Sequence, residues 1–297
     1  MSADLSPDDR VTIDSLINSG IERLKKAGIK DSRICAELTL CKLLNVSRLF
    51  ILLEKNKVID PQIAGQFREY MERRAARIPL QYILGETEFY GLPFKCDSRA
   101  LIPRPETEIL VEIVLKEMTI FEKPRILDIG TGSGNIAISL AKNLPNARVE
   151  AFDISIDALQ LAQENAEMNS VISQIEFIAG DFRDAEFMRS LGKFNCVVSN
   201  PPYVSLDDRG IIEPEVQNNE PEVALYAGQD PLSSYKAMIP VMPELLKNNG
   251  FFAFEIGYGQ HAELLKLFNS EFHEVRVSND YSNIERVISG FWRGEAK

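Results

Sequence analysis

The sequence predicts an α/β fold, in which a mostly parallel, doubly wound sheet follows a small bundle of helices. Two observations predict this fold. From about residue 125 onward, short apolar runs typical of buried strands alternate with amphipathic stretches typical of helices. Before about residue 78, apolar residues recur at helical spacing without an intervening strand-like run. A chain of 297 residues is long enough for one large domain and one small domain.

Several helices are predicted between residues 8 and 78. Gly28 suits the C-cap of the first, because a glycine tolerates the left-handed conformation that often ends a helix. Asp31 or Ser32 can cap the second, and Pro61 stands at the start of the third. These amphipathic helices predict a small bundle at residues 1–77.

The pattern changes to short β-like pieces at residues 78–102, where Gly85, Gly91 and Pro93 indicate turns. We expect a β-hairpin linker there. The Pro-Arg-Pro sequence at residues 103–105 is a rigid extended elbow, since each proline fixes its own φ and restricts the residue before it. Glu106 or Thr107 then opens a helix that runs to about residue 118, within a main domain at residues 103–297.

The main domain alternates strand and helix, which predicts parallel strands with ligands bound beyond their carboxyl ends. The expected strands are residues 125–128, 148–153, 175–179, 195–199, 251–256 and 273–278. The expected helices are residues 135–144, 156–168, 232–246 and 259–268.

Composition excludes several classes of protein. No apolar stretch approaches the roughly 20 residues of a membrane span, and the polar, acidic first ten residues are unlike a signal peptide. The four cysteines are scattered without metal-ligand spacing, as in reduced thiols of a cytoplasmic protein. Only two histidines are present, which argues against histidine-based or metal-based chemistry. We therefore expect a cytoplasmic protein without a metal site or a membrane contact.

Charge is unevenly distributed along the chain. Residues 1–77 carry 14 Lys and Arg against 11 Asp and Glu, whereas the remainder carries 19 against 33, a balance of −14. Such an acidic body is a poor binder of phosphate backbones, so no direct contact with nucleic acid is expected. The basic N-terminal segment is read more simply as a solvated helix surface than as a nucleic-acid site.

A glycine-rich turn follows the first expected strand of the main domain, with the sequence Gly-Thr-Gly-Ser-Gly at residues 130–134. Its glycines let the backbone approach a ligand closely and expose amides at a helix N-terminus. Asp153 ends the next strand, where it can accept hydrogen bonds from a ribose diol. The spacing G-x-G-x-G differs from the dinucleotide pattern G-x-G-x-x-G, and no Walker lysine is present.

Acidic Asp128 beside this turn would repel a pyrophosphate but suits the amino group and sulfonium of S-adenosylmethionine. These features favour S-adenosylmethionine over NAD as the cofactor. A structural carboxylate at the strand end is the alternative for Asp128. After the third strand, Phe182 could stack on adenine and Asp181 could accept from the adenine amino group, although core packing explains Phe182 nearly as well.

The tetrapeptide Asn-Pro-Pro-Tyr at residues 200–203 ends a short apolar strand. The Asn200 carboxamide and a nearby backbone carbonyl can both face a planar NH2 group, while the Tyr203 ring covers one face of it. A plain strand-ending turn is the alternative, because Asn-Pro dipeptides mark turns.

Together, these motifs resemble class I S-adenosylmethionine-dependent methyltransferases and, among them, the release-factor glutamine methyltransferases of HemK type. The match covers nearly the whole chain. Its most specific part is Leu-Ile-Pro-Arg-Pro-Glu-Thr-Glu at residues 101–108, accompanied by Pro-Leu-Gln-Tyr-Ile-Leu-Gly at residues 79–85 and Phe-Tyr-Gly at residues 89–91. The family usually has Gly-Leu where this chain has Pro231-Leu232, which bears on local loop geometry.

The resemblance implies a release-factor-binding helical domain, a β-hairpin linker and a Rossmann-like catalytic domain. It implies methyl transfer from S-adenosylmethionine to the N5 amide nitrogen of the glutamine in the Gly-Gly-Gln motif of peptide-chain release factors. The expected catalytic residues are Asn200, Pro201 and Tyr203, which with Pro202 would hold the substrate amide. The expected cofactor-binding residues are Asp128, Gly130, Thr131, Gly132, Ser133, Gly134, Asp153, Asp181, Phe182 and Asn200.

Two rival functions are weighed against this one. Adenine-N6 methyltransferases acting on DNA or RNA share the Asn-Pro-Pro-Tyr motif, but they require a basic cleft that the balance of −14 disfavours. A non-catalytic scaffold need not retain the glycine turn, Asp153 and the tetrapeptide together.

Overall fold

A computed structural model describes residues 11–294 and divides the chain into two compact units. The helical unit contains the described residues up to Gly85 together with Pro214–Asn219. The sheet unit contains Glu86–Glu213 and the described residues from Glu220 onward. The chain therefore leaves the sheet unit once, for six residues, and then returns to it.

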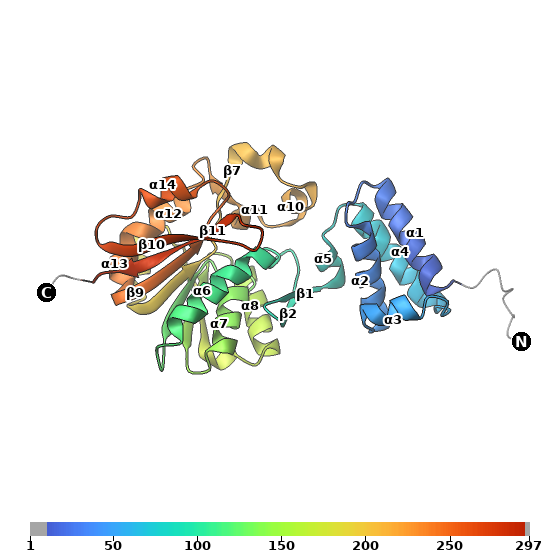
Figure 1. The fold of residues 1–297 in the computed structure, drawn as a ribbon, viewed down its shortest axis with the longest axis horizontal. Helices are drawn as coiled ribbons and strands as arrows, with labels where there is room; N and C mark the ends of the chain where they lie inside the picture. Colours follow the sequence, from blue (N-terminus) through green and yellow to red (C-terminus); the bar gives the residue numbers. More distant parts are fainter. Residues whose placement is uncertain (1–10, 295–297) are drawn as a thin grey trace, which may run out of the picture. The chain divides into compact units, whose positions relative to one another are not determined.

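The helical unit packs its helices around an apolar core that includes Leu16, Leu40 and Phe67. A capping box formed by Thr12 and Ser15 caps the N-terminus of the first helix. Gly28 adopts a φ of +72° just after that helix ends. The helices are α1 (Ile13–Lys26), α2 (Ser32–Leu44), α3 (Arg48–Leu53), α4 (Pro61–Ala75), α5 (Leu80–Leu84) and α10 (Pro214–Asn219) (Figure 1).

Two details of this unit differ from the sequence-based expectation. Asp31 is the N-cap residue of α2, but its side chain makes no capping bond; it accepts a hydrogen bond from the Cys35 thiol at 3.2 Å. The short helices α3 and α5 were not expected, because five or six residues are too few to show helical periodicity.

Ion pairs hold α10 within the helical unit. The Arg74 guanidinium, which is almost fully buried, lies 3.0 Å from the Glu215 carboxylate. Arg77 approaches the same carboxylate at 3.3 Å, and the Asn219 amide donates to the Arg77 carbonyl at 3.1 Å. These contacts explain why a segment so distant in sequence belongs with the N-terminal helices.

The expected linker at residues 78–102 is more varied than a hairpin. Helix α5 occupies its first part, and the antiparallel hairpin is confined to β1 (Glu86–Phe89) and β2 (Leu92–Lys95). Both hairpin strands belong to the sheet unit, where Phe89 and Phe94 are buried in a large apolar cluster.

A seven-stranded sheet forms the centre of the sheet unit, in the order β10-β11-β9-β6-β3-β4-β5. The five strands from β9 to β5 are parallel, and β11 runs antiparallel to both of its neighbours. The strands are β3 (Arg125–Ile129), β4 (Arg148–Asp153), β5 (Ile175–Ala179), β6 (Phe194–Ser199), β9 (Leu246–Glu255), β10 (Phe272–Asn279) and β11 (Glu285–Trp292). The mostly parallel, doubly wound α/β sheet is confirmed, and β11 is the strand that the sequence did not predict.

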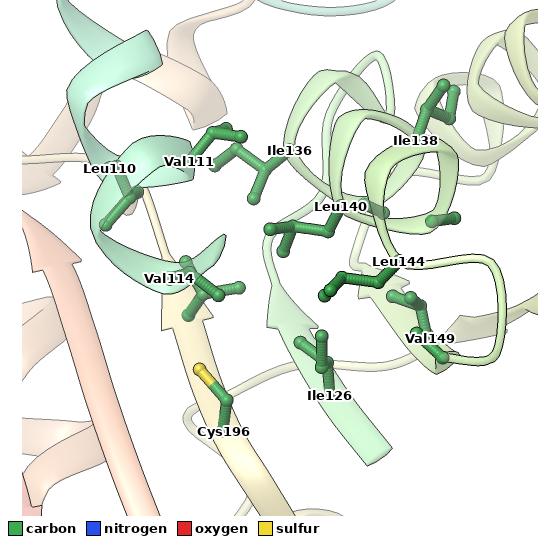
Figure 2. Packing of buried hydrophobic residues seen from close by; sticks show 14 of the residues in the cluster. Leu110, Val111, Val114, Ile126, Ile136, Ile138, Leu140, Leu144, Val149 and Cys196 are labelled. Carbon is green, nitrogen blue, oxygen red and sulfur yellow. The ribbon is translucent and has the colours of Figure 1, made fainter. Parts of the chain in front are cut away.

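Helices cover both faces of this sheet. On one face, α6 (Glu108–Met118), α7 (Asn135–Asn143) and α8 (Ile156–Met168) contribute to one apolar cluster. Figure 2 shows this packing, with Val114 of α6 and Leu140 of α7 beside Ile126 of β3. The second cluster, on the opposite face, draws on α9 (Ala185–Ser190), α12 (Ser233–Met238), α13 (Met242–Leu245) and α14 (His261–Leu265).

Prolines explain one further difference in this unit. The helix expected at residues 232–246 is broken into α12, a 3-10 turn at Ile239–Val241, and α13. Pro240 and Pro243 each lack the amide proton that a continuous helix would use. The smaller elements are α11 (Glu222–Leu225) and the paired strands β7 (Val204–Ser205) and β8 (Tyr226–Gly228).

Residues 11–294 contain neither a membrane-spanning helix nor a group of potential metal ligands. None of their helices has the length and apolar character needed to cross a membrane. Within the same range, no three His, Cys, Asp or Glu side chains are grouped as a metal site.

Candidate active site

A cavity lies at the carboxyl ends of the parallel strands, where β3, β4, β5 and β6 each continue into a loop that lines it. Parallel strands bring these loops to one edge of the sheet, which is where such folds bind ligands. Of the expected residues, those that line the cavity are Gly130, Thr131, Gly132, Ser133, Asp153, Asp181, Phe182, Asn200 and Pro202. Those that do not line it are Asp128, Gly134, Pro201 and Tyr203.

The glycine turn after β3 opens space in the cavity. The Gly130 and Thr131 amides both donate to the Phe152 carbonyl at 2.9 Å, which fixes the turn against β4. Gly132 has a φ of +56°, and a Cβ added there would meet no protein atom within 4 Å. The turn is thus a backbone cradle that a side chain would fill, as expected for a loop that receives part of a cofactor.

Gly134 has a different role. It is the N-cap of α7 with a φ of +81°, and a Cβ on it would come within 3.3 Å of the Ala162 backbone. Its position therefore brings α7 and α8 together instead of facing the cavity.

Asp128 lies beneath the turn and is fully buried. One carboxylate oxygen accepts the Thr131 hydroxyl at 2.7 Å, while the other has no hydrogen-bond partner. Burial raises the pKa of Asp128 to about 7, although hydrogen bonds from Thr131 and the Ala137 backbone lower it. Asp128 is not among the residues that line the cavity, and its bond with Thr131 fits the alternative of a structural carboxylate; the expected cofactor contact stays a prediction.

Asp153, at the end of β4, lines the cavity. Its two carboxylate oxygens accept the backbone amides of Gly132 and Ser155, both at 2.9 Å. These bonds fix the carboxylate in orientation and leave each oxygen a further lone pair for a ligand hydroxyl.

Asp181 and Phe182 follow β5 at the same edge. The Asp181 carboxylate forms a two-point ion pair with Arg183, which holds the pKa of Asp181 below its usual range. Phe182 lines the cavity and also packs against the second apolar cluster, and its expected stacking on adenine stays a prediction.

Asn200 is held at the cavity by the segment that precedes α6. Its Nδ2 donates to the Thr107 hydroxyl at 3.2 Å, and no described residue donates to its Oδ1. The carbonyls of Pro202 and Tyr203 accept from Ser234 at 2.8 Å and Gln260 at 2.9 Å.

Pro201 and Tyr203 are not among the residues that line the cavity, so their expected contacts with the substrate amide stay predictions. Pro201 is buried, and no described residue donates to its carbonyl. The Tyr203 ring packs against the second apolar cluster, and its hydroxyl reaches the Glu255 carboxylate at 3.5 Å.

Sequence reasoning missed four residues that shape the site. The buried Glu220 carboxylate accepts from the Arg104 guanidinium at 2.6 Å and from the Ile102 amide at 3.2 Å, which anchors one wall of the cavity. Thr107 and Glu255 stand behind Asn200. Arg104 and Thr107 lie in the Ile-Pro-Arg-Pro-Glu-Thr-Glu segment, and Glu255 is a charge directly after an apolar strand. Each could have been singled out by its position.

Comparison with known proteins gives two family matches. Residues 15–85 match the PrmC N-terminal domain, and residues 105–212 match the methyltransferase small domain. A release factor glutamine methyltransferase of Chlorobaculum tepidum is 36% identical over 95% of this chain and 98% of its own length. One of Moorella thermoacetica is 36% identical over 96% of this chain and 100% of its own.

The chain belongs to the release factor glutamine methyltransferases. A further relative with that name, from Fusobacterium nucleatum, is 39% identical over 92% of this chain and 77% of its own length. As a member of this family, the chain is an S-adenosylmethionine-dependent methyltransferase.

Solved structures share its fold. The catalytic domain of hMettl16, in complex with the MAT2A 3'UTR hairpin 6, aligns with a TM-score of 0.53 over 82% of this chain and 86% of its own, at 16% identity. Such low identity supports the class I methyltransferase fold alone.

Proposed function

We propose that this enzyme transfers a methyl group from S-adenosylmethionine to the N5 amide nitrogen of the glutamine in the Gly-Gly-Gln motif of peptide-chain release factors. The names of its relatives support the substrate. The single observation that carries the chemistry is the state of Asn200. Asn200 lines the cavity, its Nδ2 is fixed by Thr107, and no described residue donates to its Oδ1.

The cavity fits S-adenosylmethionine. Gly130 and Gly132 provide the backbone cradle, Asp153 offers carboxylate lone pairs for the ribose hydroxyls, and Phe182 offers an aromatic face for the adenine. When bound, the cofactor supplies a methyl group from its sulfonium centre and departs as an uncharged thioether.

The protein's own contribution is alignment and charge stabilisation. An amide nitrogen is a poor nucleophile, because its lone pair is delocalised into the carbonyl group. In our proposal, Asn200 Oδ1 and the Pro201 carbonyl accept the two N–H bonds of the substrate amide. They orient the nitrogen in line with the carbon–sulfur bond and stabilise the positive charge that grows on it.

The bond changes balance without a strong base. The new nitrogen–carbon bond forms as the carbon–sulfur bond breaks, and the methylated nitrogen then loses one proton to water. That nitrogen becomes more acidic as it gains positive charge, so the proton leaves after transfer. The geometry of Asn200 matters more in this scheme than the basicity of any side chain.

The helical unit is proposed as the second contact with the release factor. Three leucines of the short helix α3 are exposed, namely Leu49, Leu52 and Leu53. Exposed apolar groups of this size suit burial against a protein partner. The alternative is that the helices serve only stability. A release factor as substrate also implies that the reaction occurs in the cytoplasm, where translation ends.

Adenine-N6 methylation of DNA or RNA is the less favoured function. The acidic balance of −14 outside residues 1–77 opposes the phosphate backbone that such a substrate would bring. DNA and RNA therefore serve as controls in the assay of methyl transfer.

The decisive test is Asn200→Ala, assayed with labelled S-adenosylmethionine and purified release factor. We expect kcat to fall by about 100-fold or more, by analogy with the loss of one charge-stabilising group at other active sites. Cofactor affinity, measured by calorimetry, should change little. Asn248→Ala, an exposed asparagine of β9, is the matched control and should act as wild type. Near-normal methylation by Asn200→Ala would contradict the proposal.

A further inference from the structure

A buried carboxylate stands behind the Asn200 amide, separated from it by one hydroxyl group. Glu255 ends β9 and is 1% exposed, and Thr107 is also 1% exposed. Strands β6 and β9 are neighbours in the sheet, so Glu255 and the tetrapeptide after β6 leave it at the same edge. Neither Glu255 nor Thr107 contacts the substrate in the chemistry described above, although Thr107 reaches the edge of the cavity.

The hydroxyl of Thr107 links the other two groups. It accepts a hydrogen bond from Asn200 Nδ2 at 3.2 Å, so its single proton must point elsewhere. The Glu255 carboxylate is the acceptor at hand, because its buried Oε2 has no hydrogen-bond partner among the described residues, and the Thr107 side chain lowers the pKa of Glu255. The other carboxylate oxygen, Oε1, accepts from the Tyr203 hydroxyl at 3.5 Å.

We propose that Glu255, acting through Thr107, is the positioning residue that sets which end of the Asn200 amide faces the substrate. The inference rests on the proposed function and extends it. The two ends of a carboxamide have nearly the same shape, so sterics alone do not distinguish Oδ1 from Nδ2. Among the described residues, only the bond to Thr107 fixes the choice.

Glu255, Thr107 and Asn200 form a hydrogen-bond relay. The protonation state of Glu255 decides the direction in which its hydrogen bonds point. The ionised carboxylate takes the Thr107 proton, which makes the Thr107 oxygen an acceptor for Asn200 Nδ2 and leaves Oδ1 for the substrate. A protonated Glu255 can itself donate to Thr107. The Thr107 proton is then free to turn toward Asn200 and favours the flipped amide. A flipped amide presents NH2 to the substrate NH2, and two donors do not pair.

The surroundings of Glu255 place this change in the working range of pH. Burial raises the pKa of Glu255 to about 7. The other groups that act on this carboxyl come from several elements. Arg286 of β11 lowers its pKa, Glu106 before α6 raises it, and Tyr203 lowers it. Arg286 is itself paired with Asp280 at 3.2 Å, and the Tyr235 hydroxyl of α12 donates to the Glu255 backbone carbonyl at 2.7 Å.

The test is the pH dependence of kcat and KM with release factor as substrate, between about pH 5.5 and 8.5. In the wild type we expect kcat to fall as pH drops below about 7, by up to about tenfold per unit. Glu255→Gln keeps an acceptor for the Thr107 proton but cannot ionise. This variant should retain activity, and its kcat should no longer show the acid limb, that is, the fall below about pH 7.

A second pair of variants tests the same hydrogen-bond relay at Thr107. Thr107→Val cannot accept from Asn200 or donate to Glu255, and we expect kcat to fall about tenfold or more with both KM values unchanged, as for a lost transition-state interaction. Thr107→Ser restores the hydroxyl and should recover the wild-type profile. Calorimetric binding of S-adenosylmethionine to each variant reports whether its cavity is intact.

Each result separates the inference from the function beneath it. If the wild-type enzyme does not methylate release factor, the proposed function fails and the inference fails with it. If the wild type is active but its kcat is flat across this range, or the acid limb persists in Glu255→Gln, the inference alone is overturned. A limb that persists would belong to another buried acid such as Asp128. A Thr107→Val variant that changes KM and spares kcat would also overturn it.

Discussion

Asp128 and Asp153 show that the same residue type can have two different roles at one edge of a sheet. Asp153 ends β4 and Asp128 is the next-to-last residue of β3, yet Asp153 lines the cavity and Asp128 is fully buried without lining it. A sequence motif identifies a carboxylate at a strand end, but the side on which it lies depends on the path of the following loop. The pairing of Asp128 with Thr131, three residues later, decides this case.

The burial of Asp128 gives a prediction about stability and pH. The unfolded carboxyl ionises near about pH 4, whereas burial raises the folded pKa to about 7. Between these values the folded protein keeps a proton that the unfolded chain has lost, so this group's contribution to stability falls as pH rises. Asp128→Asn removes that dependence. Between pH 5 and 8, the free energy of unfolding of this variant should exceed that of the wild type by about 1 to 4 kcal/mol.

Urea unfolding at the two pH values measures this difference. Glu255 is a second carboxyl whose burial raises its pKa, and both proteins retain it, so its contribution cancels in the comparison. An unchanged difference between wild type and variant across this range would show that Asp128 is not the group that titrates.

Residue-level prediction from the sequence was most successful where the backbone alone decides position. The glycine turn and Asp153 line the cavity as expected, because strand ends and turns fix their location. For Tyr203, which is not among the residues that line the cavity, the expected contact with a substrate amide stays a prediction. Thr107 was missed, since its contact with Asn200 joins residues 93 positions apart.

At the level of elements, periodicity predicted α8 at the residues where it occurs, Ile156–Met168. The failures have physical causes. Strand β11 begins with charged residues and contains a glycine at residue 290. It therefore lacks the continuous apolar run by which a buried strand is predicted. That glycine is needed because a Cβ there would lie 3.0 Å from the Phe252 ring. Close packing of this kind is a tertiary requirement, and local sequence does not reveal it.

Two helical glycines give a matched prediction. Gly20 in α1 faces α4, where an added Cβ would come within 2.8 Å of the Phe67 ring. Gly65 in α4 is exposed, and a Cβ there would meet nothing within 4 Å. Gly65→Ala should stabilise the protein by about 0.5 to 1 kcal/mol, because alanine loses less entropy in a helix. Gly20→Ala should destabilise it by about 1 to 3 kcal/mol through overpacking.

Chemical denaturation of the two variants provides the measurement. Both carry the same substitution on the same type of element, so helix propensity is matched and packing differs. Equal changes in the free energy of unfolding of the two variants would show that the Phe67 ring moves aside without an energetic penalty.

At the scale of the whole molecule, the proposed recognition of the release factor is divided between two units. If α3 binds the factor, replacing Leu49 and Leu53 by serine should raise the KM for intact release factor by about tenfold, as for loss of an interface hot spot. These side chains are 64% and 73% exposed, so their replacement should not disturb the core. The KM for a short peptide that contains Gly-Gly-Gln should stay the same.

The control for this pair is Ile120→Ser, an apolar side chain of the sheet unit that is 79% exposed. It should leave both KM values as they are. Equal losses for factor and peptide in the leucine variant would instead indicate that the helices support only the fold.

The return of the chain to the helical unit at Pro214–Asn219 has a consequence for how the two units can be exchanged. The backbone passes between them at three points instead of one. A fragment that begins at residue 86 would still carry a piece of its missing neighbour, with Glu215 deprived of Arg74. Recombination between relatives would therefore have to transfer two separate stretches together. The units are interleaved in sequence, so we expect that they can be exchanged only as a pair.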